Sequence, residues 1–299
     1  MKILTNILVL KNKWQILTLI NLILLVVLSV VCLINYLNPS NDIVYVDNVK
    51  LFDAFQMTKE MKSIGEKEFS SKKNTIILDV RHQKEFVKGF IPNSIFIGID
   101  GGFAPWVGAI IKTVDTSILL VCDKDRLQET ATRLSRVGFD NILGHLQGGI
   151  NAWDVNDLDT MQSISSENFA SIYKKNNAIH IVDVRKASEY NSQHIIGVKL
   201  APLAHLDKHN DKFTTSNENF VHCAAGYRSV IAGSLLKKQG INNIINIEGG
   251  FGAIKETKLG RLENFYTRVF SDPAKRFANN QATAQIIGQL PRYILDRKS

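Results

Sequence analysis

One of the three cysteines, Cys223, directly follows an apolar segment and precedes a loop of small residues. The loop Ala224-Ala225-Gly226-Tyr227 leads to Arg228 and Ser229, and a helical pattern covers residues 230–238. This order predicts a strand, a loop and a helix, so that unpaired N–H groups at the helix start converge on the thiol. They stabilise the thiolate, which is the nucleophilic form of cysteine. The fixed charge of Arg228 suits an anionic substrate. We therefore expect Cys223 to be a nucleophile.

The length of this loop bears on the group that it holds. Four residues separate Cys223 from Arg228. Loops with five such residues resemble those of tyrosine and dual-specificity phosphatases, which hold a phosphate. The shorter loop resembles that of the rhodanese sulfurtransferases, which accept a sulfane sulfur, and a smaller ring fits a sulfur atom better than a phosphoryl group. The plainer interpretation is a buried structural cysteine, because free cysteine is among the most buried residue types.

The chain also contains an internal repeat. Ile-Ile-Leu-Asp-Val-Arg at residues 76–81 recurs as His-Ile-Val-Asp-Val-Arg at 180–185, Glu85-Phe86 as Glu189-Tyr190, and Gly148-Gly149 as Gly249-Gly250. Between these anchors, Cys122 aligns with Cys223. The copies lie roughly 100 residues apart, which is the size of a domain and indicates a tandem duplication. These landmarks resemble those of the rhodanese family over residues 43–258.

Three further segments are similar to the rhodanese part of a particular group of bacterial fusions. They are residues 103–108, 133–139 and 222–229. The fusions join a persulfide dioxygenase of the metallo-β-lactamase type to two rhodanese domains. The sequence lacks the His-x-His-x-Asp-His motif of the metal-binding half, and its seven histidines show no ligand spacing. We expect no metal and no organic cofactor.

Apolar runs that alternate with helical patterns predict the fold. The expected strands are residues 76–80, 117–121, 141–146, 179–184, 219–222 and 243–247. The helical patterns 127–137 and 230–239 each stop at a glycine, Gly138 or Gly240. We predict an α/β fold with two tandem rhodanese-like domains, each a parallel sheet flanked by helices on both faces. Ligands of such sheets bind at the carboxyl ends of the strands, where Cys223 lies.

The expected boundaries follow from the repeat and the N-terminal composition. Residues 1–40 form a cytoplasmic stub and a transmembrane anchor, 41–157 a first and non-catalytic domain, 158–258 a catalytic domain, and 259–299 a basic extension.

The two cysteines differ in their surroundings. Cys122 precedes Asp123-Lys124-Asp125-Arg126, so the glycine is missing and the arginine falls one place early. Two neighbouring carboxylates raise the pKa of a thiol by like-charge repulsion. We therefore expect the first repeat to be a structural partner.

Three residues near Cys223 are expected to support the site. His222 either orients and helps to deprotonate the thiol or points away from it. Asp183 with Arg185, like the pair Asp79 and Arg81, is expected to form a buried ion pair that fixes a strand end. Glu85 and Glu189 are expected to belong to the same supporting network.

The N-terminus predicts a location. Residues 14–37 carry no charge, and the apolar core 16–34 can span a hydrocarbon layer of ~30 Å. Lysines precede it and aspartates follow, so the positive-inside rule places the domains outside the cytoplasm, in the periplasm. A cleaved signal peptide is the main alternative; the length of the run and the missing cleavage site disfavour it. A free thiol is hard to maintain in an oxidising compartment, which keeps the opposite topology open.

Charge and site together lead to a functional hypothesis. The net charge of +8 comes from the two ends of the chain, so nothing favours nucleic-acid binding. The resemblance implies a rhodanese-type sulfurtransferase, and the uncharged N-terminal run predicts that it is held at the membrane. A Cys223 persulfide would carry sulfur from thiosulfate or a thiol persulfide to a thiol or cyanide acceptor, while Arg228 holds the charge of the donor. The alternatives are a non-enzymatic persulfide carrier or protein-docking module and, with less support, a cysteine-dependent phosphatase.

Overall fold

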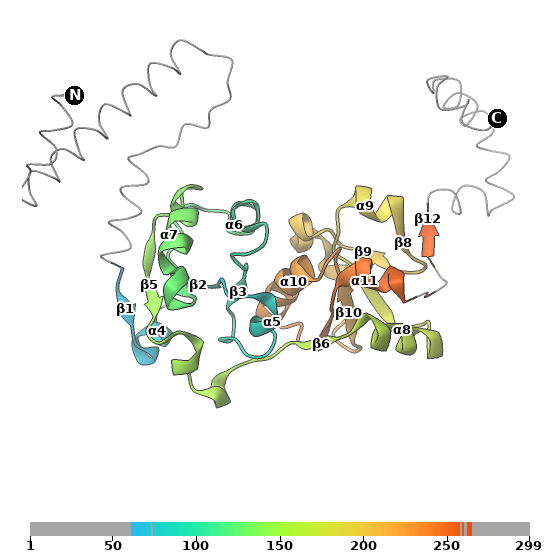
Figure 1. Ribbon diagram of the computed structural model, residues 1–299, viewed down its shortest axis with the longest axis horizontal. Coiled ribbons are helices and arrows are strands. Elements are labelled where there is room, and N and C mark those ends of the chain that lie inside the picture. Colours follow the sequence, from blue (N-terminus) through green and yellow to red (C-terminus); the bar gives the residue numbers. More distant parts are fainter. Residues whose placement is uncertain (1–60, 73, 258, 260–261, 265–299) are drawn as a thin grey trace, which may run out of the picture. The chain divides into compact units, whose positions relative to one another are not determined.

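The computed structural model describes residues 61–72, 74–257, 259 and 262–264 (Figure 1). The expected anchor at residues 14–37 and the extension after residue 264 lie outside this part of the chain. Within the described part, no helix combines the length and the apolar character that a membrane crossing requires.

Each repeat folds around a parallel five-stranded sheet. The first contains β1 (Ser63–Ile64), β2 (Ile76–Asp79), β3 (Ile95–Phe96), β4 (Ile118–Val121) and β5 (Ile142–Leu146), in the order β1-β5-β4-β2-β3. The second contains β6 (Gln162–Ile164), β7 (His180–Asp183), β9 (Lys199–Leu200), β10 (Asn219–His222) and β11 (Ile244–Ile247), in the order β6-β11-β10-β7-β9. The strand orders correspond, as expected for a duplication. A separate antiparallel pair joins β8 (Gln193–Ile195) to β12 (Leu262–Asn264).

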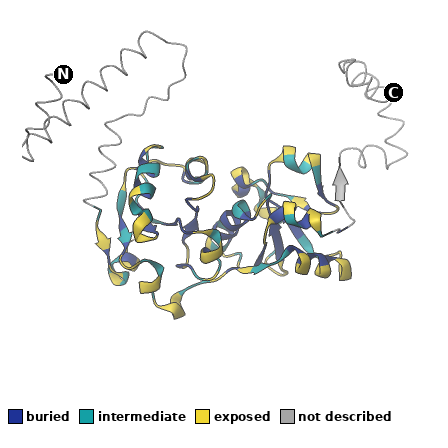
Figure 2. Ribbon diagram, in the orientation of Figure 1, coloured by how far each residue is buried: buried dark blue, intermediate teal, exposed yellow. Residues whose placement is uncertain are grey.

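Helices and turns connect these strands. In the first repeat they are α4 (Glu66–Ser71), α5 (Gln83–Phe86), α6 (Phe103–Ile110), α7 (Leu127–Ser135) and the 3-10 segments η1 (Lys124–Arg126), η2 (Gly149–Ala152) and η3 (Val155–Asp157). In the second they are α8 (Ser166–Lys175), α9 (Ala187–Ser192), η4 (Leu203–Lys212), α10 (Tyr227–Lys238) and α11 (Gly250–Glu256). The central strands β4 and β10 are buried along their whole length, and exposed residues collect on the helices (Figure 2). The predicted α/β fold with two sheets is confirmed.

The sequence prediction of the six strands is confirmed to within one residue at each end. Gly138 and Gly240 have φ angles of +85° and +89°, so each glycine adopts the left-handed conformation that ends a helix. Helix α10 begins at Tyr227, three residues earlier than the apolar pattern predicted. The helix therefore starts inside the loop that follows Cys223.

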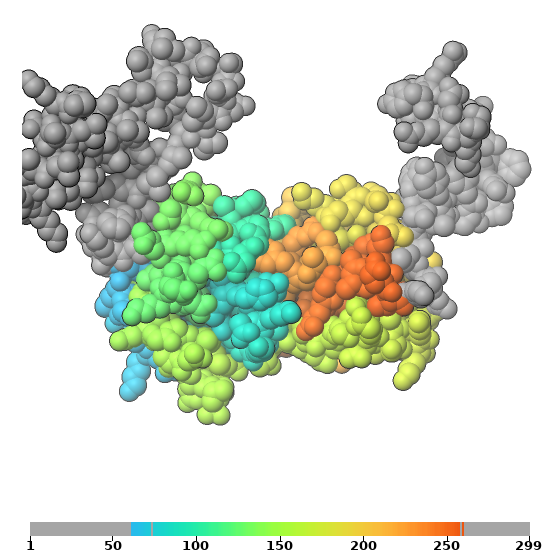
Figure 3. All heavy atoms as spheres, viewed as in Figure 1, coloured from blue at the N-terminus to red at the C-terminus, as the bar shows by residue number. Residues whose placement is uncertain are grey.

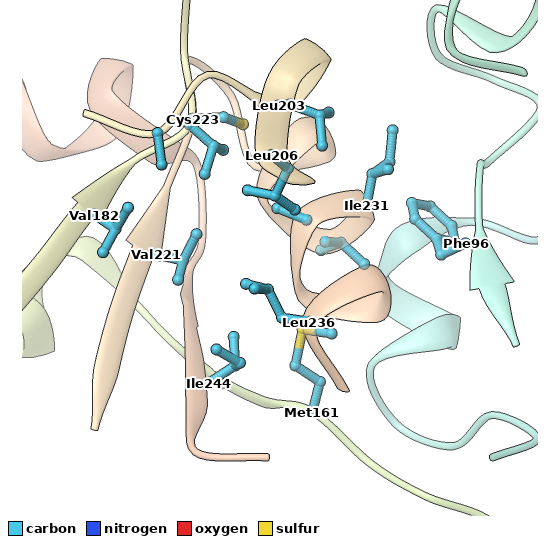
Figure 4. Close-up of a cluster of buried hydrophobic side chains, with 14 of the residues drawn as sticks. Phe96, Met161, Val182, Leu203, Leu206, Val221, Cys223, Ile231, Leu236 and Ile244 are labelled. Atoms are coloured by element: carbon cyan, nitrogen blue, oxygen red, sulfur yellow. The ribbon is translucent and has the colours of Figure 1, made fainter. Parts of the chain in front are cut away.

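Helix α10 belongs to the second repeat and also packs against the first. One cluster of buried side chains contains Val221, Ile231 and Leu236 of the second repeat together with Phe96 of the first (Figure 4). The N–H of Phe96 donates to Ser234 Oγ at 3.0 Å. In the space-filling view the cyan atoms of the first repeat touch the orange atoms of the second (Figure 3).

The C-terminal end of α10 also contacts residues that precede the second sheet in the sequence. Lys238 Nζ donates to the carbonyl oxygen of Asn93 at 3.1 Å. Lys237 Nζ lies 3.2 Å from Asp159 Oδ1. The helix that carries the Cys223 loop is therefore held along its length by the first repeat and the connecting segment.

Candidate active site

The thiol of Cys223 lies between the end of β10 and the start of α10. Gly226 is the N-cap residue of α10 and has a φ of +91°, a conformation that glycine adopts without a steric penalty. Its N–H donates to Cys223 Sγ at 3.1 Å. Cys223 is 1% exposed. The expected approach of a helix N-terminus to the thiol is thus present, with Gly226 as the donor, and such a donor stabilises a thiolate.

Backbone hydrogen bonds from the residues after Gly249-Gly250 hold the Cys223 loop in place. The N–H of Phe251 donates to the carbonyl oxygen of Cys223 at 2.6 Å, and that of Gly252 to the carbonyl oxygen of Ala224 at 3.0 Å. Gly250 has a φ of +57°, and a Cβ atom there would lie 2.5 Å from the Cys223 oxygen. The second glycine of the Gly249-Gly250 motif is therefore required for this close approach of two backbone segments.

A buried chain of polar groups begins beside the sulfur. Ser229 Oγ lies 3.6 Å from Cys223 Sγ and donates to Asn246 Oδ1 at 2.7 Å. Asn246 Nδ2 in turn donates to Ser163 Oγ at 2.7 Å. Ser229 was among the predicted site residues, whereas Asn246 and Ser163 were not. The sequence shows Asn246 as a polar residue within an apolar run, but its place near the thiol depends on the pairing of β11 with β10.

Arg228 forms a bidentate ion pair with Glu189. Its Nη1 and Nη2 atoms donate to Glu189 Oε2 and Oε1 at 2.7 and 2.8 Å. The hydrogen bonds from Arg228 lower the pKa of Glu189 to about 2, despite the opposing effect of partial burial. The bond to Glu189 also raises the pKa of Arg228, against the opposing effect of burial. Glu189 was expected in the network of Asp183 and Arg185. Its hydrogen-bond donors are Arg228 and the N–H of Lys186, the latter at 3.1 Å, and the charge of Arg185 also helps to lower its pKa.

The expected ion pairs at the strand ends are confirmed. Arg185 Nη2 lies 2.7 Å from Asp183 Oδ2, and Arg81 Nη2 lies 2.6 Å from Asp79 Oδ2, with all four side chains buried. The guanidinium of Arg185 also lies over the ring of Phe251, 3.9 Å from its centroid. These contacts fix the end of β7 and the start of α11 beside the Cys223 loop.

His222 is fully buried and makes its contacts away from the sulfur. Its Nδ1 lies 3.3 Å from the carbonyl oxygen of Cys223 and 3.9 Å from Asp183 Oδ1, and its ring stacks on Phe251. Burial lowers the pKa of His222, so its imidazole is neutral near pH 7. Within the described residues, no hydrogen bond joins this ring to Sγ. The position fits the alternative in which His222 points away from the thiol.

The corresponding site of the first repeat is built differently. Burial, followed by the charges of Asp123, Asp79 and Asp125, raises the pKa of Cys122 to about 12. The shift has the predicted direction, although burial is its larger cause. Arg126 is paired with Asp100 and Glu129, and Glu85 with Lys88 at the surface. The arginine after Cys122 is therefore paired with other carboxylates than Glu85, the counterpart of Glu189.

Tyr227 connects the Cys223 loop to the first repeat. Its hydroxyl donates to the carbonyl oxygen of Gly98 at 2.7 Å, and its ring meets Phe96 edge to face. A Cβ atom at Gly101 would lie within 2.6 Å of the same ring, so Gly101 leaves room for it. Desolvation raises the pKa of Tyr227, and the charge of Asp100 adds to this shift. The hydroxyl therefore stays protonated as a donor.

A small cavity lies beside this loop. It has a volume of about 60 Å³ and is lined by Ala225 and Gly226, by Lys84 of α5 and by Glu248. Both repeats thus contribute to its walls. Within the described residues, no group of three His, Cys, Asp or Glu side chains is placed to hold a metal ion.

Fold and site together define a class of tandem α/β proteins with a cysteine loop at the carboxyl end of a parallel sheet. The Rhodanese-like domain family matches residues 66–156 and 166–257, which together are more than half of the chain. The chain belongs to this family and carries two of its domains in tandem.

Individual proteins are similar to this chain over only part of its length. The putative sulfur carrier protein YrkF of Bacillus subtilis is 33% identical over 94 residues, which are 31% of this chain and 51% of YrkF. The chain thus spans about half the length of that relative. A rhodanese-like domain protein from Staphylococcus aureus is 28% identical, with a TM-score of 0.30, over 31% of this chain and 91% of its own. A thiosulfate sulfurtransferase from Pseudomonas aeruginosa is 22% identical, with a TM-score of 0.29, over 64% and 40%.

Proposed function

We propose that the protein is a sulfurtransferase in which Cys223 carries a sulfane sulfur from a donor to an acceptor. One observation carries the proposal: the sulfur of Cys223 accepts the N–H of Gly226 at the start of α10. Membership of the rhodanese-like family supports sulfur transfer as the type of chemistry. The proposal includes a thiol persulfide or thiosulfate as donor, a thiol or cyanide as acceptor, and repeated enzymatic turnover.

The first half-reaction loads the cysteine. The Cys223 thiolate attacks the outer sulfur of a thiol persulfide, a new S–S bond forms, and the S–S bond of the donor breaks. The donor thiol leaves as a thiolate with the electron pair of that bond. With thiosulfate the same attack releases sulfite. The Gly226 N–H bonds first to the thiolate and then stays beside the persulfide.

The second half-reaction unloads the cysteine. An acceptor thiolate attacks the outer sulfur of the Cys223 persulfide, takes that sulfur and returns the Cys223 thiolate. Cyanide can serve as acceptor in the same way and leaves as thiocyanate. Charge and sulfur balance in both steps, and neither step requires an oxidant or a metal.

A non-enzymatic sulfur carrier is the second candidate function. The burial of Cys223 favours it, because a buried persulfide would be protected until a partner opens the loop. The similarity to YrkF, described as a putative sulfur carrier protein, points the same way. Multiple turnovers with excess small donor and acceptor distinguish an enzyme from a carrier.

Two finer expectations belong to this proposal. The segments 103–108, 133–139 and 222–229 resemble the rhodanese part of persulfide dioxygenase fusions, which favours a thiol persulfide as donor. The uncharged run at residues 14–37 favours a membrane anchor that holds the domains outside the cytoplasm.

Peptide mass spectrometry after incubation with a persulfide donor tests the proposal. We expect a gain of about 32 Da, one sulfur atom, on the peptide with Cys223. The Cys223→Ser variant should gain no sulfur there and transfer none to cyanide. A sulfur adduct mainly on Cys122, or full turnover by Cys223→Ser, would refute the assignment.

A further inference from the structure

We propose that Glu189 determines which donor the Cys223 site accepts. It occupies the anion-binding edge of Arg228 and so disfavours a dianion such as thiosulfate relative to a thiol persulfide. The inference rests on the proposed function, because it names the donor class of the same thiol.

The geometry of the ion pair supplies the first argument. A guanidinium binds an oxyanion best through two parallel N–H bonds, and Arg228 already makes both of them to the two oxygens of Glu189. A sulfonate group would need the same pair of donors. The arginine that the loop pattern assigned to the donor is therefore already occupied by a carboxylate of the chain itself.

The second argument is the shielding of the pair. The side chains of Arg228 and Glu189 are 16% and 32% exposed. Removal of one partner from a shielded ion pair leaves a poorly solvated charge, so displacement of Glu189 by a donor is unfavourable. Glu189 also stays ionised at neutral pH, since its pKa is about 2. The site therefore presents a neutralised arginine to an incoming anion.

The cavity beside the loop supplies no net positive charge. Its charged lining residues are Lys84 and Glu248, which have opposite signs. An outer sulfur on a thiol fits these conditions better than a compact dianion, because a persulfide carries at most one negative charge on its two sulfurs.

The test compares two substitutions in the full-length protein. Glu189→Gln keeps the shape of the side chain and removes its charge. Glu85→Gln is the matched control, because Glu85 is the equivalent residue of the first repeat and is paired with Lys88 at the surface. The measured quantity is the kcat/KM for thiosulfate divided by that for glutathione persulfide, with the same thiol acceptor.

We expect Glu189→Gln to raise this ratio by about 10- to 100-fold, the range expected when a competing charged hydrogen bond is removed. Glu85→Gln should leave the ratio at the wild-type value. An unchanged ratio in Glu189→Gln, with both donors losing activity equally, would show that Glu189 only holds the loop and would overturn the proposal.

A binding measurement keeps the inference separate from the proposed function. In the Cys223→Ser background, sulfite affinity measured by calorimetry should rise about tenfold or more when Glu189→Gln is added. If the wild-type protein transfers sulfur from no donor, the proposed function fails, and this binding result still decides the role of Glu189. Unchanged sulfite affinity would overturn the inference even in an active enzyme.

A comparison that needs no variant covers the case in which Glu189→Gln does not fold. A thiosulfonate carries one negative charge and transfers its sulfane sulfur by the same bond cleavage as thiosulfate. The wild-type protein should use it with a kcat/KM about tenfold higher than thiosulfate. Equal values, or a preference for thiosulfate, would count against the proposal.

Discussion

The hydroxyl of Tyr227 in the second repeat donates a hydrogen bond to the carbonyl oxygen of Gly98 in the first, at 2.7 Å. Tyr227 is also the first residue of α10 and lies next to Gly226, whose N–H reaches the Cys223 sulfur. The repeat with the Asp-flanked cysteine therefore restrains the loop of the other repeat.

Tyr227→Phe should slow the loading of Cys223 with sulfur, because the loop loses its attachment to the first repeat. The loss of one hydrogen bond should also lower the free energy of unfolding by about 1 kcal/mol. Tyr173→Phe is the control, since the Tyr173 hydroxyl donates to the carbonyl oxygen of Ile196 at 3.0 Å, in another part of the fold. Both variants should lose similar stability in urea titrations, but only Tyr227→Phe should change the loading rate. Equal loading rates would contradict the role of Tyr227.

Gly250→Ala should destabilise the protein more than Gly240→Ala. Both positions have positive φ angles, so each substitution carries about 1–2 kcal/mol of backbone strain. Only at Gly250 does the new Cβ also collide with the Cys223 oxygen, which adds about 1–3 kcal/mol. At Gly240 the Cβ meets no neighbouring atom within 4 Å. Urea unfolding measures the difference, and equal losses would show that the loop can move away.

Cys122 should remain a protonated thiol well above neutral pH. Its pKa is raised from 9.0 to about 12, chiefly by burial. The raised folded-state pKa makes a contribution to stability that is complete below about pH 9 and is lost as the pH rises towards 12, because the unfolded thiol ionises first. Mass spectrometry of alkylation at Cys122 as a function of pH should give a midpoint far above that of the urea-unfolded protein.

The Cys122→Ala variant provides the stability control for this prediction. It lacks the thiol, so it should not show this part of the stability loss between about pH 9 and 12. An alkylation midpoint near pH 9 in the folded protein would contradict the environment described for Cys122.

The uncharged run at residues 14–37 should anchor the protein in a membrane, with residues 41–299 outside the cytoplasm. A reporter that is active only outside the cytoplasm should be active when fused after Ser299. The protein should also stay with membranes after an alkaline carbonate wash. A C-terminus protected from protease in spheroplasts would indicate the opposite orientation, and a soluble, shortened protein would indicate a cleaved signal peptide.

The strands and the position of the thiol could be predicted because both depend on local sequence. Continuous apolar runs predicted β4 and β10, and small residues after Cys223 predicted a tight turn before a helix. The two-residue strands β1, β3 and β9 were missed, because so short a segment has no periodicity and is defined by its hydrogen bonds to a neighbour.

The partner of Arg228 could not be predicted for a different reason. Arg228 was assigned to the donor and Asp183 to Arg185, and no spacing rule indicates that a residue of α9 reaches the first turn of α10. The structure gives Asp183 to Arg185, two residues away, and leaves Glu189 for Arg228. Likewise, Asn246 became a candidate only when β11 was found beside β10.

The contact between α10 and the first repeat has a consequence for tolerance to substitution. Within the described residues, the side chains of Asp123 and Asp125 form no hydrogen bond or ion pair with the Cys223 loop, so changes at these two positions should be accepted easily. Phe96 and Gly98 face α10 and Tyr227, so changes there should impair the sulfur transfer proposed for Cys223 in the other domain. A duplicated domain can thus remain under selection through the surface that it presents to its neighbour.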